Sequence, residues 1–463
     1  MKKYLIVMIG VVLAVQSAAA EELSLTYGRF GTVAVYRQTP HPTRVALFVS
    51  GDGGWNQGVV DMARQLAGLD ALVAGIDIVH YLKQLADSGE ACSYPAADFE
   101  NLSHFLQKKL DFPDYIQPVL IGYSSGATLV YATLVQAPPG TFSGAISLGF
   151  CPDLPLVNPF CTGSGFKMEP GPKGKGVNFL PASHLENPWI ALQGDVDQVC
   201  DPTATRRFVD QVAKGEIVML PKVGHGYSVP RNWMPQFRQA FLKIVGRQVA
   251  DTGGIDGTLS DLPLVEVQPV GKQSRTMAVI VTGDGGWAGV DRELAAGLAD
   301  RGIGVVGLNS LKYFWTPRTP QQLGSDMDRI LSHYMKSWRK EQAVLIGYSL
   351  GADVLPFAVN RLPESLRALV RCVVLLAPGR QTSFEFHLSN WIGGPSSDTF
   401  AVQPEIERIS GPSLLCLYGA QDKESVCPLL AEGSAQIEEL KGGHHFGGDY
   451  GALVQKIIAR TEP

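Results

Sequence analysis

Three features are absent from the chain, and each absence excludes a class of function. The 463 residues contain no basic run, which argues against nucleic acid as a partner at a formal net charge of −5. No Walker-type Lys-Ser/Thr follows a glycine loop and no HExxH pair occurs, so neither a nucleotide-phosphate loop nor a zinc-protease site is predicted. We therefore expect no metal and no cofactor.

The chain also has no apolar run long enough for a transmembrane helix, and one shorter apolar segment lies at its start. Two lysines precede an uncharged apolar stretch over residues 4–15, and three alanines end the segment. This order is typical of a secretory signal peptide, whose apolar part is too short to span a bilayer. We predict that residues 1–20 are cleaved, that the mature chain starts near Glu21, and that it is exported to a bacterial periplasm.

Cysteine is scarce. The seven are Cys92, Cys151, Cys161, Cys200, Cys372, Cys416 and Cys427. An exported protein meets an oxidising compartment, and an odd number leaves at least one thiol unpaired. Their positions around loops suggest Cys151–Cys161 and Cys416–Cys427 bridges, although sequence does not determine connectivity. Cys416 lies in an apolar strand-like run, so a buried free thiol is an equal alternative.

What the chain does contain is a duplicated pair of motifs. Gly-Asp-Gly-Gly-Trp occupies residues 51–55 and again 283–287, and Gly-x-Ser-x-Gly follows at 122–126 and 347–351. Each serine motif comes directly after an apolar run and before a helical segment, which is the form of a nucleophile elbow in α/β-hydrolases. The repeat predicts two homologous domains.

Apolar strand-like runs alternate with helical segments in both halves, which favours mostly parallel sheets flanked by helices. The predicted fold class is therefore α/β, with two tandem α/β-hydrolase-like domains. We place the N-terminal domain at residues 21–250, a glycine-rich linker at 251–262 and the C-terminal domain at 263–463. In the second half, strands are expected at 277–281, 305–308, 343–346, 372–376 and 414–418, and helices at 292–300, 322–340 and 352–361.

A catalytic serine needs a histidine base and an acid that orients it, and in α/β-hydrolases they follow in the order serine, acid, histidine. Both halves keep this order with the same number of residues between serine and acid. The predicted sets are Ser349, Asp422 and His444 or His445 in the second half, and Ser124, Asp197 and His225 in the first. Asp195 competes with Asp197 as the acid.

The Gly-Asp-Gly-Gly-Trp loops follow the first buried strand of each half, where α/β-hydrolases place part of the oxyanion hole. Glycines let backbone N–H groups approach a developing oxyanion closely. The candidate donors are the N–H groups of Asp284, Gly285 and Leu350 in the second half and of Asp52, Gly53 and Ser125 in the first. A phosphate-cradling loop is the alternative.

Residues 281–287, 347–356 and 442–450 resemble the bacterial virulence protein VirJ/AcvB family. The two-domain form with a signal peptide is similar to its AcvB-like members. The resemblance implies a periplasmic serine hydrolase that cleaves the aminoacyl ester of lysyl-phosphatidylglycerol to lysine and phosphatidylglycerol through an acyl-enzyme. Similarity to VirJ-like members implies a link to type IV secretion. The first half matches less well, so we expect a weaker or accessory role for Ser124.

The implied substrate suggests further residues. Asp353, four positions after Ser349, is our candidate for holding a cationic lysyl group, and Trp287 for contacting the substrate. We expect apolar surface for lipid contact from among Trp287, Tyr313, Phe314, Trp315 and Trp391. We expect a lid in residues 382–397. The expected partners are an aminoacylated phospholipid at the membrane surface and secretion-system proteins. A non-catalytic secretion adaptor and a general carboxylesterase are the competing functions.

Overall fold

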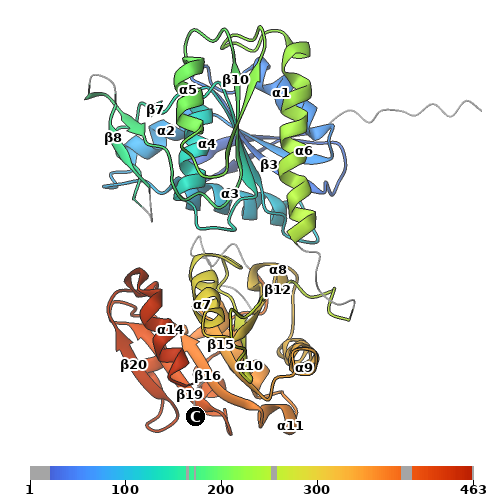
Figure 1. Ribbon diagram of the computed structural model, residues 1–463, viewed down its shortest axis with the longest axis vertical. Coiled ribbons are helices and arrows are strands. Elements are labelled where there is room, and N and C mark those ends of the chain that lie inside the picture. Colours follow the sequence, from blue (N-terminus) through green and yellow to red (C-terminus); the bar gives the residue numbers. More distant parts are fainter. Residues whose placement is uncertain (1–20, 163–165, 172–173, 252–257, 387–398, 461–463) are drawn as a thin grey trace, which may run out of the picture.

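The computed structural model describes residues 21–162, 166–171, 174–251, 258–386 and 399–460. The predicted signal peptide, Trp391 and the larger part of the predicted lid lie outside these ranges. The described chain forms two halves, one above the other in Figure 1, and each half is built around its own sheet. None of the described helices is at once long and apolar enough to cross a bilayer.

The N-terminal half contains an eight-stranded sheet in the order β1-β2-β4-β3-β5-β6-β10-β11. The pairings from β4 to β11 are parallel, and β1 and β2 add an antiparallel edge. The strands are β1 (Glu21–Tyr27), β2 (Gly31–Arg37), β3 (Arg44–Val49), β4 (Ala71–Ile76), β5 (Val119–Tyr123), β6 (Gly144–Leu148), β10 (Trp189–Gly194) and β11 (Gly215–Leu220).

Helices cover both faces of this sheet. One face packs against α2 (Ile78–Asp87), α3 (Pro95–Lys109), α4 (Ser125–Gln136) and α5 (Pro202–Val209), and the other against α1 (Gln57–Ala67) and α6 (Met234–Asp251). A three-stranded sheet of β7 (Asp153–Leu154), β8 (Met168–Pro170) and β9 (Val177–Phe179) and the short turns η1 (Gly28–Phe30) and η3 (Pro230–Asn232) complete this half.

The C-terminal half repeats the design with seven strands in the order β12-β14-β13-β15-β16-β19-β20. Only β12 runs antiparallel to its neighbour. The strands are β12 (Leu264–Val267), β13 (Thr276–Val281), β14 (Gly304–Leu308), β15 (Gln342–Tyr348), β16 (Val370–Leu376), β19 (Ser413–Gly419) and β20 (Gln436–Leu440).

One face of the second sheet packs against α8 (Ser310–Tyr313), α9 (Pro320–Ser337), α10 (Leu350–Val359), α11 (Glu364–Arg367) and α13 (Gln403–Glu407), and the other against α7 (Gly289–Ala299) and α14 (Tyr450–Ile458). Short elements are β17 (Gln381–Thr382), β18 (Phe400–Ala401), η4 (Cys427–Leu429) and η5 (Phe446–Gly448). The α/β prediction with two sheet-based halves is confirmed. Leu259 and Leu262, inside the predicted linker, are buried in the second core, which therefore begins before residue 263.

The disulfides correct one predicted pairing. Cys151 bonds to Cys200, and Cys161 bonds to Cys92, so the expected Cys151–Cys161 bridge is wrong. The Cys416–Cys427 bridge is confirmed, and Cys372 is a buried free thiol. The error has a topological cause, because Cys151 follows β6 and Cys200 follows the neighbouring strand β10, which brings their loops together.

The halves are stacked head to tail. The first half contributes loops that precede its strands, including Tyr115 before β5 and Gly140 before β6. The second half contributes loops that follow its strands, including Trp287 after β13 and Trp315 after β14. Helix α3 accordingly lies on the side of the upper half that faces α7 and α8 of the lower half (Figure 1).

Candidate active sites

The serine of the second half sits on a strained strand-to-helix turn. Ser349 joins β15 to α10 with φ 51° and ψ −120°, a conformation that L-residues rarely adopt. Its neighbours must be glycine, since a Cβ at Gly347 would lie 2.4 Å from the carbonyl oxygen of Gly351, and one at Gly351 would lie 1.9 Å from that of Val281. The Ser349 N–H donates to the carbonyl of Leu376 at 2.9 Å. This is the geometry of a nucleophile elbow.

Two loops at the same edge of the sheet bring the other predicted residues to this serine. Asp422 follows β19 and His444 follows β20. The Ser349 Oγ lies 2.9 Å from His444 Nε2, and His444 Nδ1 lies 2.7 Å from Asp422 Oδ2. With Nδ1–H donating to the carboxylate, Nε2 is free to accept the serine proton. Asp422 is nearly buried, whereas 41% of the His444 side chain is exposed to an incoming molecule.

The structure separates the two adjacent histidines. His444 contacts Ser349, whereas His445 Nδ1 lies 2.6 Å from the hydroxyl of Tyr348. Burial and the neighbouring His444 lower the pKa of the His445 imidazole. A neutral His445 accepts the tyrosine hydroxyl hydrogen at Nδ1. His444, not His445, is therefore the histidine that bridges the serine and the acid.

The first half holds an equivalent constellation. Ser124 has φ 55° and ψ −123°, and its Oγ lies 2.9 Å from His225 Nε2. His225 Nδ1 in turn lies 2.9 Å from Asp197 Oδ2, and the second Asp197 oxygen accepts the N–H of Cys200. Asp195, the competing acid, instead accepts the backbone N–H of Lys222 in the turn after β11, at 2.7 Å. Both predicted serine–histidine–aspartate sets are thus brought together.

Each acid loop is also tied down by a disulfide. Cys200 lies three residues after Asp197 and is bonded to Cys151, while Cys427 lies five residues after Asp422 and is bonded to Cys416. Cys200 Sγ, with Asp197 and His225, would offer three ligand atoms within 4.8 Å of one another. Because that sulfur is in a disulfide, it is not a thiolate ligand, and the group is better explained as the triad itself.

The glycine loops lie beside the two serines, and the oxyanion role of their N–H groups stays a prediction. A Cβ built at Gly283 would lie 3.5 Å from Ser349 Cβ, and one at Gly51 would lie 3.0 Å from Ser124 Cβ. The next residues, Asp284 and Asp52, therefore follow directly beside the serines. The two loops differ in one contact: the Asp52 carboxylate accepts the Ser125 hydroxyl at 2.5 Å, whereas residue 350 of the second half is leucine.

The two predicted substrate residues have different surroundings. Asp353 lies on the first turn of α10, and its carboxylate accepts the N–H of Gly379 at 2.6 Å. Burial raises its pKa well above the usual range, and the charges of Asp284 and Asp422 raise it further. The indole of Trp287 packs closely against Gly307 of β14, where a Cβ would lie 2.1 Å from the ring. Substrate contact by Trp287 stays a prediction beside this packing role.

Two acidic residues near this site escaped the motif-based prediction. Asp291 on α7 is 2% exposed, and one of its carboxylate oxygens has no hydrogen-bond partner in the described part of the chain. Glu100 comes from α3 of the other half, and burial together with the charge of Asp284 raises the pKa of its carboxyl to about 8. Neither belongs to a motif, so only the packing of α7 and α3 reveals them.

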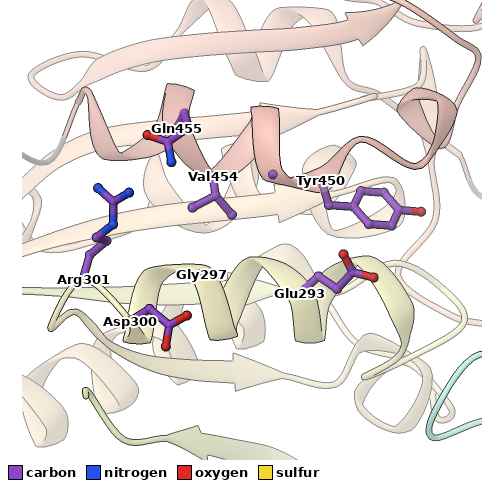
Figure 2. A pocket seen from close by; sticks show the side chains of 8 residues that line it. Glu293, Gly297, Asp300, Arg301, Tyr450, Val454 and Gln455 are labelled. Atoms are coloured by element: carbon purple, nitrogen blue, oxygen red, sulfur yellow. The ribbon is translucent and has the colours of Figure 1, made fainter. Parts of the chain in front are cut away.

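Tyr313, Phe314 and Trp315 are buried and are not free apolar surface for a lipid. A hollow of about 260 Å³ does open between α7 and α14, but no triad residue lines it. In Figure 2, Glu293 and Tyr450 lie at one end of this hollow and Asp300, Arg301 and Gln455 toward the other. The hollow is therefore separate from the two candidate active sites.

The family of the chain follows from its sequence match. The bacterial virulence protein (VirJ) family matches residues 43–144 and 275–462, which is more than half of the chain. The chain belongs to the VirJ family. The second segment contains the whole Ser349 triad, whereas the first ends before Asp197 and His225.

Several solved structures are similar to one half of this VirJ-family chain. The esterase Est1E of Butyrivibrio proteoclasticus is 14% identical, with a TM-score of 0.33, over 50% of this chain and 99% of the other. An α/β serine hydrolase without a lid from Xanthomonas campestris is 20% identical, with a TM-score of 0.31, over 50% and 94%. The esterase domain of a Rhodothermus marinus protein is 14% identical, with a TM-score of 0.33, over 48% and 98%. A search of curated proteins finds no significant match.

Proposed function

We propose that this VirJ-family protein is a periplasmic serine hydrolase that cleaves the aminoacyl ester of a phospholipid, converting lysyl-phosphatidylglycerol to lysine and phosphatidylglycerol. The observation that carries the proposal is the continuous hydrogen-bonded series from Asp422 through His444 to Ser349, at 2.7 and 2.9 Å, on a strained elbow. Three disulfides are consistent with export to an oxidising compartment.

In the proposed reaction, Ser349 Oγ attacks the ester carbonyl carbon while His444 Nε2 takes the hydroxyl proton. The negative oxygen of the tetrahedral intermediate is stabilised by backbone N–H groups, one from Leu350 and the other from Asp284 or Gly285. The carbonyl–oxygen bond to the glycerol breaks, and His444 returns its proton to that leaving oxygen. A water molecule, deprotonated by His444, then hydrolyses the acyl-enzyme and releases the amino acid.

In the proposed reaction, Asp422 acts through His444. Its carboxylate fixes the Nδ1–H tautomer of His444 and stabilises the imidazolium that forms at each step. The exposed edge of His444 leaves the serine side accessible to a bulky ester.

The test compares two single variants. Purified Ser349→Ala protein should lose hydrolysis of lysyl-phosphatidylglycerol in vesicles by about 10⁴-fold or more, because the nucleophile is gone. Ser124→Ala should retain most of it. Unchanged hydrolysis by Ser349→Ala would contradict the proposal. Equal turnover of short acyl esters and aminoacyl lipids by the wild type would favour a general carboxylesterase instead.

The first half presents a second complete triad, so its contribution is tested separately. A fluorophosphonate that labels activated serines should modify Ser349, and labelling should fall when that residue is alanine. We propose an accessory role for Ser124, and labelling that disappears only in Ser124→Ala would reverse this ranking. A stable complex with secretion-system proteins that survives both substitutions, with no ester turnover, would support the adaptor function.

A further inference from the structure

Apolar side chains are exposed on the two loops that carry the acid and the histidine of the first half's triad. Val196 comes directly before Asp197 and is 56% exposed, and Val199, two residues after Asp197, is 67% exposed. Val229 follows His225 by four residues and is exposed as well. Apolar side chains gathered on one exposed surface mark a contact with a protein or a membrane. We call these three valines the apolar rim.

The second half has different residues at the matching positions. Counted from Asp422 and His444, these positions hold Gln421, Glu424 and Gly448. Two polar residues and a glycine thus serve the same fold and the same constellation of serine, histidine and aspartate. Neither the fold nor the triad therefore requires the apolar rim, which is a property of the first half.

Hydrogen bonds hold the two rim loops in place. The Val196 N–H donates to the carbonyl of Val223 at 3.2 Å, which joins the acid loop to the histidine loop. The buried indole of Trp233 donates its Nε1–H to the carbonyl of Tyr227 at 2.8 Å and so braces the histidine loop from below. The valines are therefore exposed on a backbone that is fixed by its own contacts.

A hollow of about 550 Å³ adjoins the rim at the start of α6. Its lining begins at Pro230, directly after Val229, and extends along α6 to Leu242, which is exposed. The lining is mostly apolar, and its charged residues are two arginines, Arg231 and Arg238. Helix α6 runs from the end of the upper half that points away from the second half (Figure 1), so the hollow lies outside the contact between the halves.

The charge of this surface is positive although the chain carries a net charge of −5. Among the described residues, neither Arg231 nor Arg238 forms an ion pair with an acidic side chain. The exposed acids of the acid loop are already engaged, since Asp195 accepts the N–H of Lys222 and Asp201 accepts that of Ala204. An anionic partner with an apolar part complements such a surface.

We infer that the apolar rim and the adjoining hollow bind the surface of a bilayer that contains anionic phospholipid. Side chains that protrude from separate loops suit a fluid apolar layer, whereas a protein partner needs a closely matched surface. The arginines attract the lipid phosphates. A second copy of the chain is a poorer occupant, because a symmetric contact would bring the arginines of both copies together.

Attachment to a bilayer requires no turnover and is therefore independent of the proposed hydrolysis. It gives the first half a role that does not need Ser124, since this half would hold the protein on the lipid surface. The edge of the first sheet that carries Ser124 then faces the bilayer.

The charge contribution is measured by co-sedimentation of the purified protein with vesicles of equal parts phosphatidylglycerol and phosphatidylethanolamine. Arg231→Gln combined with Arg238→Gln should weaken binding at least tenfold, because each arginine near an anionic surface adds to the affinity. Arg206→Gln combined with Arg207→Gln is the matched control, since it removes two exposed arginines from α5, on the other face of the same sheet. It should weaken binding less than threefold.

The apolar contribution is tested on the rim itself. Val196→Gln combined with Val199→Gln should also weaken binding at least tenfold, because two exposed valines no longer enter the apolar layer. Val270→Gln is the control, since Val270 is 59% exposed but lies in the second half, before β13. In separate variants, Val229→Trp should shift tryptophan emission to shorter wavelengths when the vesicles are added, and Val270→Trp should not.

Several results would overturn the inference. Equal binding to vesicles of phosphatidylcholine alone would do so, as would equal losses in the test and control variants. A dimer that Leu242→Gln disrupts, in the absence of vesicle binding, would assign the hollow to a second copy of the chain.

Hydrolysis separates attachment from chemistry. The Arg231→Gln and Arg238→Gln double variant should raise the apparent KM for lysyl-phosphatidylglycerol in vesicles at least fivefold and change turnover of a soluble short acyl ester less than twofold. Equal effects on both substrates would contradict the inference. Hydrolysis that survives Ser349→Ala would instead refute the proposed function, and co-sedimentation would still decide the attachment.

Discussion

Trp315 lies at the centre of a small apolar cluster between the halves, and replacing it with alanine is a direct test of the stacked arrangement. Only 2% of this side chain is exposed, and its ring packs against Phe386, Tyr115 and Lys108. Its Nε1–H donates to the carbonyl of Phe112 at 2.8 Å. Three of these four partners belong to the first half, so the loss falls mainly on the coupling between the halves.

The size of the effect follows from the burial. A buried tryptophan removes about 150–250 Å² from water, worth roughly 4–6 kcal/mol at about 25 cal/mol per Å². Partial collapse of the site reduces this gain, and Trp→Ala changes in cores cost about 3–5 kcal/mol. The unpaired Phe112 carbonyl adds about 1 kcal/mol if water does not reach it. We therefore expect Trp315→Ala to lower the free energy of unfolding by about 4 kcal/mol.

The assay is urea unfolding followed by far-UV circular dichroism, with a double-mutant cycle between Trp315→Ala and Tyr115→Ala. A coupling energy of about 0.5–3 kcal/mol is expected for residues in contact. Trp338→Ala is the control, because Trp338 packs on Tyr334 inside the second half and should show no coupling to Tyr115. A loss below about 1 kcal/mol for Trp315→Ala, or additive effects in the cycle, would refute the stacked interface.

Three further predictions concern the site and its support. His444→Gln should lower kcat by about 10⁴-fold, whereas His445→Gln should lower it less than tenfold, as steady-state assays of both variants would show. Burial raises the pKa of Glu100 in the folded protein to about 8, against 4.5 ordinarily, so the free energy of unfolding should fall as the pH rises between these values. Denaturant titrations across this range should show a smaller fall for Glu100→Gln. Gly307→Ala forces a methyl group into the Trp287 ring, so a loss of about 1–3 kcal/mol in unfolding free energy is expected from the same titrations.

The chemistry-bearing motifs were predictable because they are local. A glycine-flanked serine between an apolar run and a helix needs no distant partner to be recognised, and the order of the later aspartate and histidine follows from strand order. The choice of His444 over His445 was not predictable. It depends on the direction in which the loop after β20 turns and on the hydroxyl of Tyr348, which captures His445.

Contacts between loops that lie far apart in the chain could not be predicted from the sequence pattern. Cys151 lies ten residues before Cys161, yet it pairs with Cys200, because adjacent strands in the sheet decide which loops meet. Helix α3 is a stronger case, since its His104 packs against Phe386 of the second half. No periodicity within α3 distinguishes a residue at a domain contact from one on a solvated face.

The head-to-tail stacking also explains why duplication need not give two equivalent halves. The interface uses loops that precede strands in the first half and loops that follow strands in the second. Parallel sheets carry their active sites at the ends of strands, so the first half leaves its own site outside the contact while its opposite edge adjoins the other site. In the described part of the chain, Ser124 therefore lies away from the contact between the halves, whereas Ser349 lies at the sheet edge that adjoins it. The two copies of one fold thus differ in their surroundings because of their order in the chain, although both hold a serine, a histidine and an aspartate together.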